Sequence, residues 1–492
     1  MKSIRHLLMI VTLMIITGAA AQDLADRVSE YTLDNGMRVI LVKQGAAPVI
    51  AFNLTFDVGG IDEPNGLGGI AHMVEHMAFK GTRSIGSLDP EAEAAALSKV
   101  EDLALALRQA EQGGNADDIS QAQAAFDEAR QQAQSLAQTS PLDDLLSTNG
   151  GVGLNASTGY DRTSFVVSLP SNRLELYARI YADVLLNPTF RFFYEERDVV
   201  REERRMRNED DPQGFLFDAF TQAAFSKSPY QRPLIGTGEE IESYLATEAK
   251  AFFDTYYYPN RAVLVLVGDV EPERDIAIIR RFFGVLPAAP DARPELAQEP
   301  PQTQEKRITV EYDAQPQIVI GYHKPTFPNR DAFVLDLVDA LLSSGRTSRL
   351  FQRMVLGDQS ALNITTSSAF PAVRLDNLFI FYGLPRSPFG PEDLEAAFDE
   401  EIARLKNEPV SEEELQKVKN QVRANTIRSL ASASGLASNL AFNELFAGGW
   451  ERLIDDLEVY DSITADEIQA AVQRYFTPEN RTIAILRTKE AN

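Results

Sequence analysis

Two histidines and a glutamate share one short run of this sequence, His72-Met73-Val74-Glu75-His76. Histidine is scarce in the chain, because its other two histidines are His6 and His323. On a helix, residues four apart lie on one face, so both imidazoles of the run can point at one cation. Glu75 lies at the flank of that face, where it can act as a general base on a water molecule at the metal. The order H-x-x-E-H therefore predicts a zinc site, and the alternative is an ordinary pair of histidines on a helix.

A third protein ligand must come from elsewhere, because a catalytic zinc site has three protein ligands and one open position. The charged, helical run 194–204 supplies the candidates Glu195, Glu196, Glu202 and Glu203. Glu196 and Glu203 are seven positions apart and share a face. One of them could bind the metal while the other orients a histidine. A solvated charged helix is the alternative, and the residues alone leave the choice among the four glutamates open.

Composition and charge limit the possible classes of protein. The chain has 492 residues, 44% of them hydrophobic and 24% charged, as in globular proteins. This length calls for more than one domain. The formal net charge of −25 argues against nucleic acid and anionic membranes as partners. The chain has no cysteine, so we expect neither a disulfide nor a stable lipid anchor.

The first 21 residues have the pattern of a secretory signal peptide. Lys2 and Arg5 precede an apolar run, 7–16, that is too short to span a bilayer. Small residues then lead to a cleavage site near Ala21. We therefore expect a mature chain in a bacterial periplasm or outside the cell, which suits a cysteine-free protein.

The mature chain shows an internal repeat. Residues 257–266 and 475–486 both have the pattern of a helix end, a proline turn and an apolar strand. A proline-rich linker, 285–305, lies between the repeats. We predict an α+β fold of two homologous halves, each a mixed β-sheet packed with helices. The first domain, 22–284, would bind zinc and carry the catalytic residues, and the second, 306–492, would not bind zinc.

Within the first half, two shorter patterns position the histidine run. Residues 31–58 alternate as strand, turn and strand, and a glycine-rich loop follows before the predicted histidine helix. Residues 90–138 are rich in Ala, Gln and Glu, with apolar residues at helical spacing on both sides of Gly113-Gly114. We predict an antiparallel helical hairpin inside an insertion over 90–146. We interpret it as a projecting structural insert rather than a docking arm.

The segment 68–82 around the two histidines resembles the active-site block of the pitrilysin/insulinase family of zinc peptidases. It is most similar to the mitochondrial-processing-peptidase-like branch. Blocks at 155–163, 196–200, 230–237 and 345–351 agree with the family pattern. The resemblance covers nearly all of the mature chain except the insertion.

The resemblance implies a role for each residue of the site. It makes His72, His76 and Glu203 the ligands of one zinc ion per chain. Glu196 becomes a supporting carboxylate and Glu75 the catalytic base. His76 and Glu203 are 127 positions apart (203 − 76), which exceeds the family's usual separation by about the length of the insertion.

The implied activity is zinc-dependent hydrolysis of peptides or unfolded polypeptides, in a chamber that two halves enclose like a clamshell. Asn155 and Ala156 begin an apolar strand whose edge, in the family, pairs with an extended substrate.

One feature departs from the family pattern. Members that work alone have an arginine and a tyrosine that grip the substrate, at positions matched here by Val355 and Leu362. We therefore expect a heterodimer, in which a homologous partner subunit supplies the Arg/Tyr pair, as in the two-chain enzymes of this family. The alternatives are a self-sufficient single-chain or homodimeric peptidase, a non-catalytic structural or chaperone subunit, and a zinc scavenger.

Overall fold

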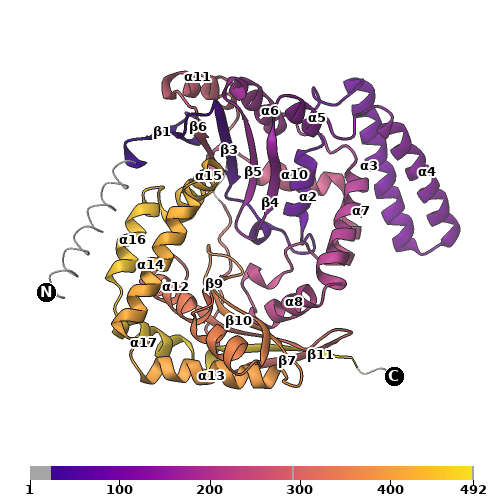
Figure 1. Cartoon of the computed structure of the whole chain (residues 1–492). Coiled ribbons are helices and arrows are strands. Elements are labelled where there is room, and N and C mark those ends of the chain that lie inside the picture. The colour runs from indigo at the N-terminus through magenta and orange to yellow at the C-terminus, as the bar shows by residue number, and fades with distance from the viewer. Residues whose placement is uncertain (1–23, 291–292, 490–492) are drawn as a thin grey trace.

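Two β-sheets, one from each half of the chain, organise the fold (Figure 1). The computed structural model describes residues 24–290 and 293–489. The predicted signal peptide, 1–21, lies outside the described residues. The predicted fold class is confirmed, because helices pack on two mixed sheets in an α+β arrangement.

The first sheet has six strands in the order β1-β2-β6-β3-β5-β4. Strands β2 and β6 are parallel, and the other neighbours are antiparallel. The strands predicted within 31–58 form, but they are not neighbours, because β6 lies between β2 and β3. The bounds are β1 (Val28–Thr32), β2 (Arg38–Lys43), β3 (Val49–Phe56), β4 (Val152–Thr158), β5 (Thr163–Pro170) and β6 (Ala262–Gly268).

The second sheet repeats this plan with five strands in the order β7-β11-β8-β10-β9. The pair β7 and β11 is parallel, like β2 and β6 in the first sheet, and the remaining pairs are antiparallel. Strands β6 and β11, which the internal repeat predicted, occupy equivalent places in the two sheets. The bounds are β7 (Lys306–Tyr312), β8 (Gln317–Lys324), β9 (Ala361–Phe370), β10 (Asn377–Pro385) and β11 (Arg481–Thr488).

Helices connect the strands and cover the sheets in both halves. Those of the first half are α2 (Ile70–Ala78), α3 (Pro90–Gly113), α4 (Ala116–Gln134), α5 (Pro141–Thr148), α6 (Leu174–Leu186), α7 (Phe193–Arg204), α8 (Pro212–Ala224), α9 (Gly238–Ser243), α10 (Ala246–Tyr256) and α11 (Pro272–Phe283). Those of the second half are α12 (Arg330–Ser343), α13 (Pro391–Asn407), α14 (Glu412–Ser429), α15 (Ala433–Phe442), α16 (Arg452–Ser462) and α17 (Ala465–Tyr475). Among the described residues, no helix is both long and apolar enough to cross a membrane.

The two halves exchange a helix with each other. Helix α8, from the first half, packs on β7, β8 and β11 of the second sheet. Helix α15, from the second half, packs on β3 and β6 of the first sheet. The apolar clusters beneath α8 and α15 therefore each contain residues from both halves, and this shared burial joins the halves.

Gly321 in β8 makes room for one of the exchanged helices. A Cβ atom at this position would lie 2.5 Å from the ring atom Cζ of Phe220, on α8. Phe220 is fully buried in the cluster between α8 and the second sheet. The absence of a side chain at Gly321 thus lets the helix approach the sheet closely.

Polar contacts also join the halves at the loop 371–376, between β9 and β10. The carboxylate of Asp161 accepts hydrogen bonds from the backbone nitrogens of Val373, at 2.7 Å, and Arg374, at 2.9 Å. The Tyr230 hydroxyl donates to the same carboxylate, at 2.8 Å. Asp161 and Tyr230 come from two of the blocks that carry the family resemblance, and their contacts hold a loop of the second half against the first.

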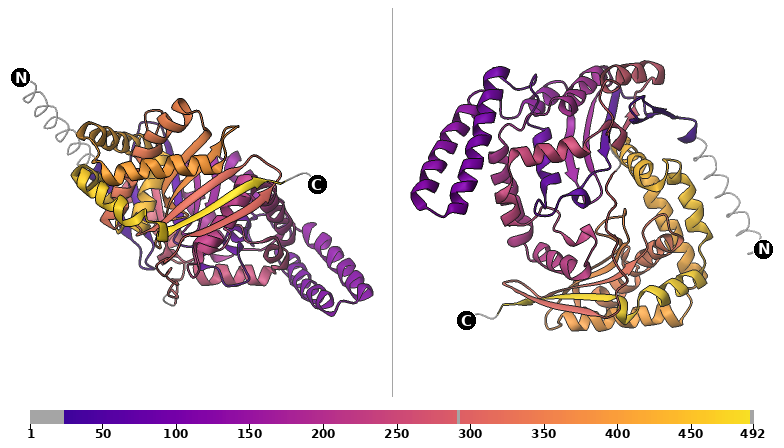
Figure 2. Two further views of the ribbon diagram at one scale, coloured as in Figure 1. Left: turned by 90° about the horizontal axis from the view of Figure 1, so that it is seen from below. Right: turned by 180° about the vertical axis from the view of Figure 1, so that it is seen from behind.

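The predicted helical hairpin is present as α3 and α4. Figure 2 shows it extending from the side of the first half. Apolar residues of the two helices face each other and are buried: Val100, Ala104, Leu107, Phe126, Ala129 and Ala133. Its base is anchored to the body of the protein, because Glu93 pairs with Arg191 at 2.7 Å and both side chains are almost fully buried. The hairpin is thus a firmly seated extension of the first half.

Candidate metal centre

Helix α2 carries the histidine run and begins at a glycine that no other residue could replace without strain. Gly69 has a φ of 86°, and a Cβ there would lie 2.0 Å from the carbonyl oxygen of Ile235. The buried carboxylate of Glu63 accepts hydrogen bonds from the backbone nitrogens of Gly69, at 2.9 Å, and Ala71, at 3.0 Å. These contacts satisfy the first turn of the helix and fix the direction in which α2 leaves the loop.

Helix α7 packs against α2 and brings a second set of carboxylates to the histidines. Its four glutamates have different surroundings. Glu195 accepts hydrogen bonds from Arg130 and Gln134 of the hairpin, and Glu202 pairs with Arg205 at the surface. Glu196 and Glu203 instead face α2, so their contacts distinguish them from the other two.

The structure brings together His72, His76 and Glu203. Glu203 Oε2 lies 3.7 Å from His72 Nε2 and 3.6 Å from His76 Nε2. One ligand atom from each of the three residues lies within 4.8 Å of the others. Two imidazoles and one carboxylate form a donor set that Zn²⁺ accepts in catalytic sites, with a fourth position left open. The described residues therefore fit a zinc ion at this place.

The second glutamate of α7 supports His76. Glu196 Oε2 lies 3.1 Å from His76 Nδ1, so the nitrogen that faces away from Glu203 has a carboxylate partner. The other oxygen of Glu196 lies 2.5 Å from Lys80 Nζ. Such a carboxylate behind a ligating histidine orients the ring and raises its basicity. His72 has no equivalent support, since its Nδ1 is buried without a hydrogen-bond partner among the described residues.

The two histidines differ in their affinity for a proton. Burial and, to a smaller extent, the neighbouring His76 lower the pKa of His72 to about 4. Burial also opposes a charge on His76, but the hydrogen-bonded carboxylate of Glu196 and the nearby carboxylate of Glu203 outweigh it and raise its pKa to about 9. The neighbouring His76 in turn holds the pKa of Glu203 below its usual value. A metal ion at this site must therefore compete with a proton on His76.

Glu75 lies on the same helix as the histidines and faces β4. It is 8% exposed, and its Oε2 accepts a hydrogen bond of 2.6 Å from the hydroxyl of Thr158, at the end of that strand. Burial raises the pKa of Glu75, although the hydrogen bond from Thr158 opposes the shift. A buried carboxylate with a raised pKa holds a proton more readily than an exposed one, as a general base requires.

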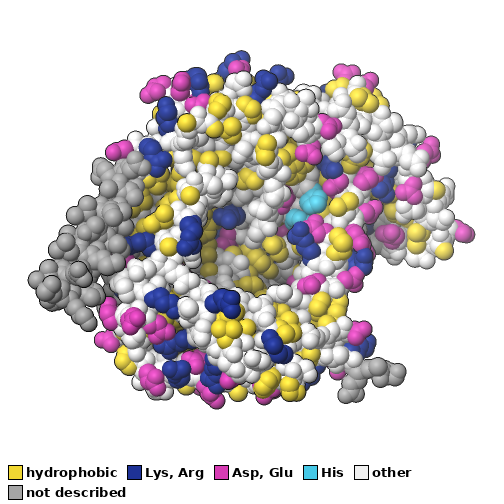
Figure 3. Space-filling view, viewed as in Figure 1, with side chains coloured by type: hydrophobic (Ala, Val, Ile, Leu, Met, Phe, Trp, Pro, Cys, Tyr) yellow, Lys and Arg dark blue, Asp and Glu magenta, His cyan; other side chains and the backbone are white. Residues whose placement is uncertain are grey.

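The predicted substrate-binding residues Asn155 and Ala156 lie on β4, which is the edge strand of the first sheet. Asn155 is exposed and Ala156 is half-buried. Figure 3 shows a hollow between the two halves, with histidine side chains visible at its wall. The second half offers no Arg/Tyr pair at the two matched positions. Val355 packs partly buried on its core, and Leu362 of β9 is 44% exposed.

Sequence reasoning missed three residues that contact the site or its helix. Lys80 is four positions after His76, in the turn that follows α2, so a helical spacing carried one step past the helix could have indicated the contact with Glu196. Thr158 lies in one of the blocks that carry the resemblance, but nothing in the sequence indicates its contact with Glu75. Glu63 comes before the glycine-rich loop, and its role at the start of α2 depends on how that loop folds.

Two histidines and a carboxylate lie together on an α+β fold of two halves, and comparisons with known proteins give the family. The model described as Insulinase (Peptidase family M16) matches residues 38–98 and 135–238. The model described as Peptidase M16 inactive domain matches residues 245–422. Together these matches cover well over half of the chain, which belongs to the M16 peptidase family. The gap in the first match, 99–134, falls inside the hairpin.

Known relatives extend over almost the whole chain. The zinc protease PqqE of Helicobacter pylori is 25% identical over 495 residues, covering 99% of both chains. The solved structure of a protease from Helicobacter pylori has a TM-score of 0.79 and 24% identity, and covers 94% of this chain and 99% of its own. The periplasmic protease PqqL from Escherichia coli has a TM-score of 0.69 and 19% identity, and the match spans 48% of its length. These two structures are similar to this chain in fold.

Proposed function

We propose that this chain is a zinc-dependent endopeptidase that hydrolyses peptides or unfolded polypeptides. The observation that carries the proposal is the convergence of His72, His76 and Glu203 within 4.8 Å, next to the buried carboxylate of Glu75. Membership of a peptidase family and relatives named zinc proteases support it. In this proposal His72, His76 and Glu203 hold one zinc ion, and Glu196 keeps His76 in position.

In this proposal the zinc site, Glu75 and Thr158 have separate roles in peptide hydrolysis. A bound zinc ion would activate a water molecule and polarise the scissile carbonyl group. Glu75 takes a proton from the attacking water and gives it to the leaving amine. Its raised pKa suits this exchange, and the hydroxyl of Thr158 holds the carboxylate in place.

The substrate would bind as an additional strand at the edge of the first sheet. Strand β4 ends the sheet, so its outer backbone groups are available to an extended peptide. Asn155 and Ala156 lie on this edge, on the strand that also holds Thr158. A peptide paired here would pass close to Glu75, because Thr158 and Glu75 are hydrogen-bonded.

We further propose that the chain works as the zinc-bearing subunit of a heterodimer. Leu362 and Val355 have no side-chain donor for the substrate, so a homologous partner would supply an Arg/Tyr pair. A self-sufficient single-chain or homodimeric enzyme is the alternative. We also propose a periplasmic or secreted location, on the pattern of residues 1–21, and the E. coli relative in fold is described as a periplasmic protease.

The test is hydrolysis of a mixed pool of unstructured peptides by the purified mature chain with zinc. Glu75→Gln is the blank, because it removes the base and leaves the three ligands. Cleavage above this blank supports the peptidase and removes the need for a partner. Cleavage that begins only when a homologous subunit is added supports the heterodimer. Binding of one zinc ion per chain without cleavage, both for the chain alone and with a homologous subunit, would favour a structural subunit or a zinc scavenger.

A further inference from the structure

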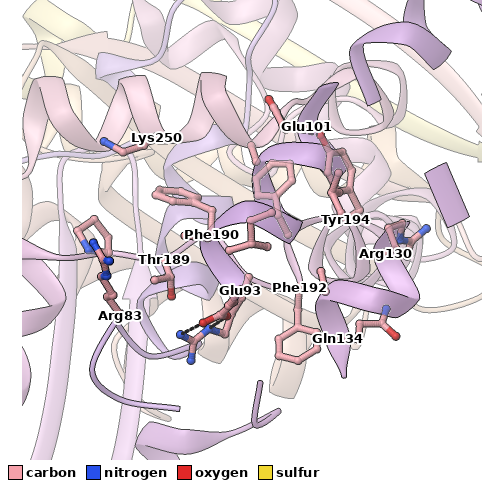
Figure 4. A pocket seen from close by; sticks show the side chains of 18 of the residues that line it. Arg83, Glu93, Glu101, Arg130, Gln134, Thr189, Phe190, Phe192, Tyr194 and Lys250 are labelled. Carbon is pink, nitrogen blue, oxygen red and sulfur yellow. Dashed lines mark hydrogen bonds and ion pairs between the residues drawn. The ribbon is translucent and has the colours of Figure 1, made fainter. Parts of the chain in front are cut away.

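A second concave site lies on the far side of helix α7 from the histidines. It is a cavity of about 380 Å³ between the base of the hairpin, the segment 187–195 and the start of α10 (Figure 4). None of the residues of the proposed zinc site lines it. Its volume lies in the range of small-molecule sites in proteins.

Most of the cavity wall is apolar. Phe190, Phe192 and Phe193 contribute from the segment before and at the start of α7, and Leu97 and Val100 contribute from α3. In a well-packed protein such side chains normally fill the space between them. Here they leave a cavity, and its surface is suited to an aliphatic group.

The carboxylates in the wall are all partnered within the protein. Glu93 pairs with Arg191 at 2.7 Å. Glu101 accepts a hydrogen bond of 2.6 Å from the Tyr194 hydroxyl. The third carboxylate, Glu195, is held by Arg130 and Gln134 of α4, at 2.8 and 2.5 Å. Arg191 and Arg130 thus neutralise Glu93 and Glu195, whereas Glu101 keeps its charge and has only the neutral donors Tyr194 and Thr247.

Cationic side chains also line the wall. Three of the four are ion-paired, Arg130 with Glu195, Arg191 with Glu93 and Lys250 with Asp254. The guanidinium group of Arg83 is exposed and has no ion pair or side-chain hydrogen bond among the described residues. Lys250 pairs with Asp254 at the surface of α10. Figure 4 shows Arg83 and Lys250 on the same side of Phe190.

The backbone of the wall is strained at one residue. Phe192 has a φ of 56°, in the left-handed region that bulky residues rarely adopt. It immediately precedes α7 and places its ring in the wall of the cavity. Strained residues of this kind concentrate at ligand sites, where the surrounding structure holds them in place.

From the apolar wall, the free guanidinium group and the strained Phe192, we infer that this cavity binds a single-chain aliphatic carboxylate. The hydrocarbon chain would lie among the phenylalanine rings, and the carboxylate would face Arg83 and Lys250. This site is independent of the proposed peptidase activity.

The experiment is calorimetric titration of the mature protein with octanoate. We expect saturable binding of one octanoate per chain. Octylammonium, which has the same chain length and the opposite charge, should bind at least about tenfold more weakly. Arg83→Ala should weaken octanoate binding about fivefold, or about 1 kcal/mol, as expected for one partly exposed charge pair. Arg179→Ala, an exposed arginine outside the cavity, should change nothing.

A blocking substitution tests the location of the site. Ala94 is exposed at the cavity, so Ala94→Trp should cover it without disturbing the core. Ala95→Trp is the matched control, because Ala95 is exposed on the same helix but does not line the cavity. Octanoate binding should be lost in the first variant and kept in the second. Equal binding of octanoate and octylammonium, or unchanged octanoate binding in Ala94→Trp, would overturn the inference.

Discussion

Glu196→Gln should weaken zinc binding without removing a ligand. The carboxylate lies 3.1 Å from His76 Nδ1 and 2.5 Å from Lys80 Nζ. The amide of glutamine is uncharged, so the substitution removes the electrostatic attraction to both groups. Carboxylates behind a ligating histidine typically contribute about 10- to 100-fold in metal affinity, which is about 1.4 to 2.7 kcal/mol. Since His72 has no such partner among the described residues, we expect a loss near the upper end of this range.

The assay is equilibrium competition for zinc between the protein and a chromophoric chelator at fixed pH. Glu202→Gln is the matched control, because Glu202 lies on the same helix but pairs with Arg205 at the surface. It should bind zinc like the unmodified protein, whereas Glu203→Gln should lose far more affinity than Glu196→Gln. Zinc affinity of Glu196→Gln equal to that of Glu202→Gln would refute the supporting role of Glu196.

Three further predictions concern stability. Glu93→Ala leaves the buried guanidinium of Arg191 without its ion pair, so unfolding free energy should fall by about 3 kcal/mol, seen as a lower urea midpoint. Gly321→Ala places a methyl group against Phe220 and should cost about 1–3 kcal/mol in the same assay. Burial raises the pKa of Asp339 to about 7, because the folded protein favours the neutral carboxyl group. The stability that this group contributes is therefore fully present below about pH 4 and is lost as pH rises through about 7, where the buried carboxyl group ionises. Asp339→Asn should therefore match the unmodified protein near pH 4 and be more stable at pH 8.

Each of these predictions has a control or a result that would contradict it. Glu91→Ala changes an exposed glutamate on the same helix as Glu93 and should leave the urea midpoint unchanged. Phe220→Leu should recover part of the loss in Gly321→Ala, and purely additive effects of the two substitutions would contradict the proposed clash. For Asp339→Asn, a stability difference that stays constant from pH 4 to pH 8 would show that the carboxyl group does not titrate in this window.

Local sequence patterns predicted much of the site, because the contacts within α2 depend only on helical spacing. His72, Glu75 and His76 lie on one helix as expected. The choice of Glu203 over its neighbours needed the family resemblance, since spacing alone left four glutamates. In the structure Glu195 is held by the hairpin and Glu202 by Arg205, whereas Glu196 and Glu203 face α2.

Contacts between distant parts of the chain could not be predicted in this way. The internal repeat indicated two similar sheets, but it contained no sign that α8 and α15 pack on the sheet of the opposite half. The hydrogen bond from Thr158 to Glu75 likewise joins residues 83 positions apart and depends on the placement of β4 beside α2. Such contacts follow from tertiary packing, and local periodicity carries no information about them.

The central claim is that His72, His76, Glu203 and Glu75 together form a working peptidase site. The most direct test is peptide hydrolysis by the chain isolated from its own cells, with any partner subunits still attached, in parallel with the same preparation of Glu75→Gln. We predict cleavage that depends on zinc, returns when zinc is restored after chelation, and is absent from Glu75→Gln. Equal cleavage by the two preparations, or no cleavage by a zinc-loaded assembly, would contradict the proposed function.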